Sequence, residues 1–111
     1  MPVKLKFWDE QTATKFAGFV PKKGIDGFLG IRIDSFEPGQ LVASFKVLPD
    51  MVTMIGNIHG GCISAFCDHV LGVVLYPAMP KGSWAATTEF KINLLRPVSE
   101  GICTASAEVI A

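Results

Sequence analysis

The longest apolar run in the chain, Cys62 to Met79, limits the possible folds more than any other feature. Its side chains are hydrophobic on nearly every side of a helix, so such a helix must be enclosed on most sides. A run of this length also resembles a membrane span, but Asp68 and His69 lie near its centre. Pro77 and Pro80 then interrupt its end. We therefore expect a buried helix of a soluble domain and no membrane span.

The segments before this run predict a helix and a β-hairpin. Asp9 is a suitable N-cap for a short amphipathic helix that continues to about Phe19. The residues from Leu29 to Phe36 alternate between apolar and polar, as do those from Leu41 to Leu48. The sequence between them, Glu37-Pro38-Gly39-Gln40, is typical of a turn, so the two runs predict paired antiparallel strands.

Two more strands are predicted after the apolar run, from Trp84 to Leu95 and from Gly101 to Ala111. One buried helix among antiparallel strands defines an α+β fold in which a sheet wraps around the helix. We expect residues 1–111 to form a single domain, with residues 1–24 as its N-terminal helical segment.

Composition limits the partners and the compartment. Half of the residues are hydrophobic, which is more than one small core can easily cover, so we expect a homo-oligomer or an apolar ligand. Ten basic residues balance ten acidic ones, so no net field would attract nucleic acid. The three cysteines have no metal-binding spacing, and the N-terminus lacks the features of a signal peptide. Both observations favour a cytoplasmic protein with reduced thiols and no metal.

Asp68 is the first candidate for chemistry, because a lone carboxylate in an apolar helix is costly unless it is paired or used. It could be a base near a substrate, or it could make a structural hydrogen bond to the backbone or to His69. Cys62 and Cys67 lack a base upstream, and no serine lies in a GxSxG motif. A thiol or serine nucleophile is therefore not expected.

Gly60 and Gly61 are the second candidate, because the first N–H groups of a helix are unpaired and can bind a developing oxyanion. The alternative is a flexible junction between a loop and the helix. His59 could orient a substrate or simply cap the helix. Asp68 follows Gly60 by eight residues, which is roughly 12 Å along a helix. If both serve one reaction, two subunits must place their helices side by side and antiparallel.

The segments Gly56-Asn57-Ile58-His59-Gly60-Gly61 and TTEFKINLLRP (Thr87 to Pro97), with Asp68 between them, resemble the hotdog-fold thioesterases of the PaaI type from phenylacetate degradation. The resemblance extends from Leu29 to Ala111. It implies hydrolysis of acyl-CoA thioesters by a homodimer or homotetramer, with coenzyme A as part of the substrate and no cofactor. Gly60 would polarise the thioester carbonyl, and Asp68 of the partner chain would act as general base or nucleophile.

The same resemblance implies roles for the remaining candidates. His59 would support the site, Thr87 would help to hold the water, and Gly61 would allow close approach of the substrate. Thr53 occupies a position where many relatives have Asn or Gln, and Asn57 could compensate for that difference. Lys91 and Arg96 could meet the phosphates of coenzyme A or remain ordinary solvated charges.

The family usually continues through two more strands beyond the position of Ala111, which predicts open sheet edges in this chain. Three alternatives to an active thioesterase therefore remain. The first is a non-catalytic protein that binds acyl-CoA, the second is an inactive truncated fragment, and the third is a dehydratase of the same fold.

Overall fold

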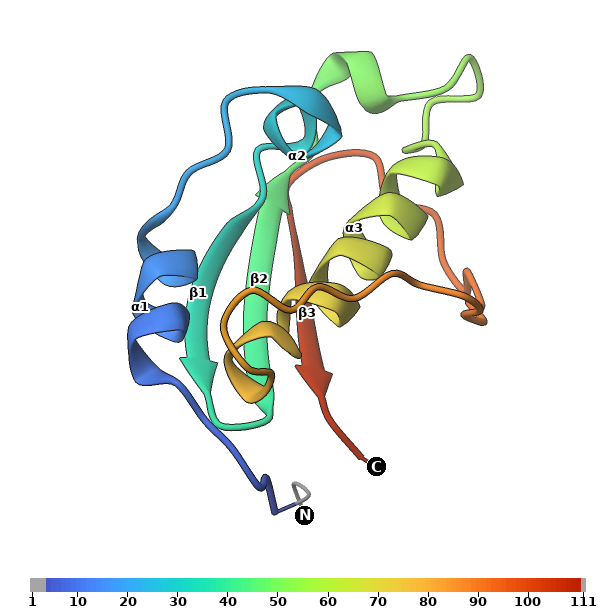
Figure 1. The fold of residues 1–111 in the computed structure, drawn as a ribbon. Helices are drawn as coiled ribbons and strands as arrows, with labels where there is room; N and C mark the ends of the chain where they lie inside the picture. Colours follow the sequence, from blue (N-terminus) through green and yellow to red (C-terminus); the bar gives the residue numbers. More distant parts are fainter. Residues whose placement is uncertain (1–3, 111) are drawn as a thin grey trace.

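A three-stranded antiparallel sheet carries a long helix, α3 (Gly60–Val73), across one face in the computed structural model, which describes residues 4–110 (Figure 1). The strands lie in the order β1 (Arg32–Glu37), β2 (Gln40–Lys46) and β3 (Ile102–Glu108). The predicted α+β class is therefore confirmed. The last predicted strand is observed as β3, and its expected end at Ala111 lies outside the described residues.

The core is formed by one face of β2 and one stripe of α3. Every second residue of β2 is buried, and α3 contributes buried residues at i, i+4 and i+7 spacing. These residues are Leu41, Ala43 and Phe45 of β2, and Phe66, Val70 and Val73 of α3. The rings of Phe45 and Phe66 meet edge to face, with centroids 4.7 Å apart. Most other side chains of α3 are only half buried, so one chain alone does not enclose the helix as the sequence predicted.

Helix α1 (Glu10–Gly18) begins at the predicted N-cap. The Asp9 carboxylate accepts hydrogen bonds from the Thr12 hydroxyl at 2.8 Å and from the Gln11 N–H at 3.1 Å. The Thr12 bond is the main reason that the pKa of Asp9 lies below its usual value. The Asp9 N–H donates to the Pro77 carbonyl at 2.7 Å. This bond fixes α1 to the short 3-10 helix η2 (Tyr76–Ala78) that follows α3.

A second short helix, α2 (Gly24–Leu29), was not predicted. It ends at Gly30, whose φ of 66° is a left-handed cap that favours glycine. The first strand therefore begins at Arg32, and its expected start at Leu29 is wrong. The hairpin itself is confirmed, because Glu37 pairs with Gln40 across the predicted turn.

The predicted strand from Trp84 to Leu95 is wrong. This segment crosses over α3 without regular structure, as the orange part of the ribbon shows (Figure 1). No backbone hydrogen bond joins residues 86–95 to any other residue between 4 and 110. A cavity of about 190 Å³ separates residues 90–92 from residues 105–107 of β3. A strand requires a neighbour to pair with, and this cavity keeps the segment away from the free edge of β3.

The helical stretch Gly60–Ala78, 19 residues long, has the length and hydropathy of a membrane span. Its apolar stripe nevertheless packs on the sheet, and its central polar residues have protein partners. The side chain of Asp68 binds Thr87, and that of His69 binds Asp26 of α2. These contacts are those of a core helix in a soluble domain.

Candidate active site

Asp68 and Thr87 meet at the edge of an open cavity of about 590 Å³. Asp68 is half buried on α3, and its Oδ1 atom accepts a hydrogen bond from the Thr87 hydroxyl at 2.5 Å. No ion pair to Asp68 is seen within the described part of the chain. The carboxylate therefore keeps a second oxygen that can act on a molecule in the cavity.

His69 does not hold Asp68 in place. Its Nδ1 atom lies 3.2 Å from Oδ1 of Asp26, on α2. This contact ties α2 to α3, and His69 and Asp26 line the same cavity as Asp68. The structure therefore does not contain the hydrogen bond between Asp68 and His69 that the sequence left open as a structural role for Asp68.

The start of α3 offers backbone groups instead of side chains. The Nδ1 atom of His59 accepts a hydrogen bond from the Gly61 N–H at 2.8 Å, so His59 is the N-cap of the helix. The Gly61 N–H is thus already used. The Gly60 N–H has no hydrogen-bond partner among residues 4–110 and is the donor that remains for a ligand.

Leu94 lies directly over Gly60. A side-chain carbon built at Gly60 would be 2.7 Å from the Cδ1 atom of Leu94, which is too close for any real contact. Glycine is therefore needed here unless the Leu94 side chain moves.

The other predicted residues divide between two places. Asn57 and Arg96 line a cavity of about 220 Å³ together with Gly60. The Thr53 hydroxyl lies 3.3 Å from the Asn57 amide oxygen, so these two residues act as a pair in the loop before α3. Lys91 lines the separate cavity beside β3. Asp68 and Gly60 of one chain line different cavities, in agreement with the distance expected from helix geometry.

The residues of the Asp68 cavity that were not predicted as site residues include Phe16 of α1, Asp26 of α2 and Tyr76 of η2. Phe16 and Tyr76 pack against each other with ring centroids 5.4 Å apart. The amphipathic pattern predicted the helix, but only the tertiary packing shows that Phe16 lies against Tyr76.

Metal and thiol chemistry have little support in this region. No cluster of three His, Cys, Asp or Glu residues suited to a metal ion occurs in the part of the chain that the structure describes. Burial raises the pKa of the Cys67 and Cys103 thiols. A raised pKa lowers the fraction of reactive thiolate at neutral pH.

Comparison with known proteins identifies the class. The sequence profile of the thioesterase superfamily matches residues 55–111, slightly more than half of the chain, and the chain belongs to this superfamily. A protein of Saccharolobus solfataricus, provisionally named an esterase, is 30% identical over 87 residues. That match covers 78% of this chain and 57% of the relative, so the chain spans little more than half of the relative's length.

Solved structures identify the fold more closely. A phenylacetic acid degradation-related protein from Ralstonia eutropha superposes with a TM-score of 0.77 at 21% identity, over 87% of this chain and 75% of that one. A thioesterase from Haemophilus influenzae superposes with a TM-score of 0.72 at 24% identity, over 97% of this chain and 72% of that one. The PaaI protein of Escherichia coli superposes with a TM-score of 0.66 at 28% identity, over 73% of this chain and 57% of that one. The fold is the hotdog fold with a shortened sheet, and the PaaI-type resemblance is confirmed.

Proposed function

We propose that the protein hydrolyses acyl-CoA thioesters to a free acid and coenzyme A, with Asp68 as the residue that drives the reaction. The observation that carries this proposal is the half-buried Asp68 carboxylate, which faces a cavity and has a single hydroxyl partner, Thr87. A carboxylate in this setting in a chain of the thioesterase superfamily is suited to activate an attacking water.

The chemistry requires two groups. Asp68 would either take a proton from the water that attacks the thioester carbon or attack that carbon itself. The carbonyl oxygen becomes negatively charged in either case, and a backbone N–H aimed at it would stabilise that charge. The unpaired Gly60 N–H is the donor we assign to this role. When Asp68 acts as a base, collapse of the intermediate releases the free acid, and the proton taken from water passes to the leaving thiolate to give coenzyme A. When Asp68 attacks directly, collapse releases the thiolate and leaves an acyl anhydride on Asp68, which a water then hydrolyses to the free acid, supplying the proton of the thiol.

A second copy of the chain would bring these two groups together. Asp68 and Gly60 of one chain are separated by roughly 12 Å of helix and line different cavities. The unpaired backbone of residues 86–95 offers an edge to which another copy can add. Leu95 is 87% exposed on that segment, and Ile55 is 90% exposed in the loop before α3. A homodimer or homotetramer would cover these apolar side chains.

Arg96 is the better of the two candidates for a contact with the phosphates of coenzyme A. It lines the cavity that holds Gly60 and Asn57, whereas Lys91 lies beside β3. We also place the protein in the cytoplasm, where its three unpaired cysteines would stay reduced.

The test is the release of free thiol from a panel of acyl-CoAs by the wild type and by Asp68→Asn. Light scattering and a thermal melt should first show that both are folded oligomers. We expect turnover by the wild type and a loss of about a thousandfold in kcat for the variant, in line with the usual contribution of a general base. Equal background rates from both proteins would overturn the proposal.

One alternative has its own signature in the same experiment. A non-catalytic protein that binds acyl-CoA would show a higher melting temperature with acyl-CoA but no thiol release. The shortened sheet favours this alternative, because it leaves part of α3 uncovered.

A further inference from the structure

A second cavity, here called the α1 cavity, adjoins the Asp68 cavity and has no assigned role. Its volume is about 590 Å³, and its lining includes Phe16 of α1, Phe19 at the C-cap of α1 and Lys81 of the turn after η2. Phe16 lines both cavities. The two spaces therefore meet at one half-buried aromatic ring.

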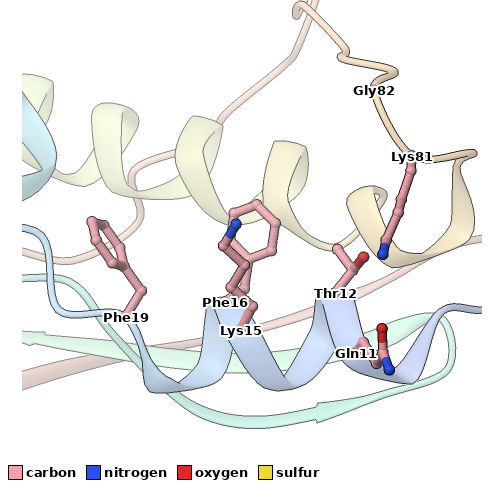
Figure 2. Close-up of a pocket in the computed structure, with 7 residues that line it drawn as sticks. All are labelled: Gln11, Thr12, Lys15, Phe16, Phe19, Lys81 and Gly82. Atoms are coloured by element: carbon pink, nitrogen blue, oxygen red, sulfur yellow. The ribbon is translucent and has the colours of Figure 1, made fainter.

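Phe16 and Phe19 give the α1 cavity an aromatic wall suited to hydrocarbon, while Gln11, Lys15 and Lys81 bring polar groups to the same cavity. Thr12 and Phe16 rise from the same side of α1, and Phe19 follows at the extended C-cap beyond the end of the helix (Figure 2). The Thr12 hydroxyl is already engaged by Asp9 and has no need of a ligand. Lys81 reaches toward Thr12 from the opposite wall (Figure 2). The methylene stem of a lysine can cover apolar surface while its ammonium group stays in water.

Phe16 is placed to divide the two spaces. Its ring packs on Tyr76, which lines the Asp68 cavity from η2. The bond between the Asp9 N–H and the Pro77 carbonyl holds α1 and η2 together at this point. An acyl chain that extends from the Asp68 cavity into the α1 cavity would therefore pass the ring of Phe16, which lines both, before it reaches Phe19.

We infer that the α1 cavity receives the distal part of a long, unbranched acyl chain, and that Phe16 sets the chain length at which this contact begins. The inference rests on the proposed function, because it takes the thioester to lie at Asp68. Each cavity has the size of a typical small-molecule site, and a single chain could use both. The preferred substrates would then be long-chain acyl-CoAs.

The experiment compares kcat/KM for octanoyl-, dodecanoyl- and hexadecanoyl-CoA in the wild type and two variants. Phe16→Trp should narrow the passage, and Phe19→Ser should remove apolar wall only at the far end. Each buried methylene contributes roughly fourfold, so we expect both variants to lower the preference for hexadecanoyl- over octanoyl-CoA by at least about tenfold. Phe28→Trp is the matched control, because Phe28 is also partly exposed but lines neither cavity.

The outcomes separate this inference from the proposed function. Asp68-dependent turnover with the same chain-length preference in all variants would overturn the inference and leave the function intact. If the wild type hydrolyses no acyl-CoA, the proposed function fails. Calorimetric binding of S-alkyl-CoA thioethers of the same three lengths then decides the inference. Loss of long-chain binding in Phe16→Trp but not in Phe28→Trp would support the inference. Equal binding by both variants would overturn it.

Discussion

The two ends of the proposed chemistry lie on one helix but are built differently. At the start of α3 the useful group is a backbone N–H, that of Gly60, and the side chain of Leu94 lies where a side chain of residue 60 would begin. Two turns further on the useful group is the Asp68 side chain, which faces an open cavity. A backbone donor needs small residues around it, whereas a carboxylate needs a partner that positions it. One helix can provide both, but only two helices can bring them to the same substrate.

Mixing two inactive variants is the strongest test of this difference. Asp68→Asn and Gly60→Ala should each be nearly inactive alone. If the site is shared in a dimer, random mixing leaves one intact site in half of the dimers, which is about a quarter of the wild-type activity. The two variants are unfolded and refolded together, and thiol release then measures the activity of the mixture. A mixture no more active than its parts would mean that each chain carries its own complete site.

Gly60→Ala and Leu94→Ala sharpen the comparison at the backbone end. We expect Gly60→Ala to lower kcat/KM about a hundredfold, because its methyl group would block the approach of the carbonyl to the N–H. Leu94→Ala should have little effect. The double variant distinguishes the causes: it stays inactive if the methyl group blocks the substrate, and it recovers if the only fault was the collision with Leu94.

Thr87→Val and Thr87→Ser test the side-chain end. Valine keeps the shape but loses the hydroxyl, so we expect kcat to fall about tenfold, equivalent to about 1.4 kcal/mol. Serine keeps the hydrogen bond to Asp68 and should stay within a few-fold of the wild type. Steady-state kinetics of both variants measures these changes in kcat. A loss in the serine variant with an unaffected valine variant would show that the methyl group of threonine, not its hydroxyl, is the important part.

His59 should matter for stability more than for rate. His59→Ala removes the cap of α3, and the expected cost is about 1 kcal/mol. In a domain of this size that lowers Tm by roughly 4 °C, which a thermal melt detects. His59→Asn can cap the helix and should restore most of the loss. A large fall in activity at an unchanged Tm would instead show that His59 contacts the substrate.

The sequence predicted the elements whose signals are local. Asp9 caps α1 through bonds to residues two and three positions away, and the hairpin turn at Gly39 requires only its own backbone. The sequence did not predict α2, because Gly24 and Gly27 are poor helix formers and the alternation from Leu29 onwards favoured a strand.

The predicted strand from Trp84 to Leu95 failed for a different reason. Its alternating residues have the pattern of a strand, but a strand forms only where a neighbour accepts its hydrogen bonds. The candidate site was also predicted only in part, because its tertiary neighbours leave no local pattern in the sequence. Asp68 and Gly60 were identified from their types and spacing, whereas Thr87 was implied only by the family resemblance, and the structure places Thr87 against Asp68. The place of Phe16 and Tyr76 beside Asp68 depends on how α1 packs on η2, which no local pattern shows.

The unpaired backbone of residues 86–95 has a consequence for hydrogen exchange. In a single chain its amide hydrogens are exposed to solvent and should exchange with deuterium far faster than those of β2, which is bonded on both sides. Pairing of this segment with another copy would slow that exchange without any change elsewhere in the chain. Deuterium uptake at these residues, followed across protein concentrations, therefore reports assembly of the molecule in the absence of any substrate.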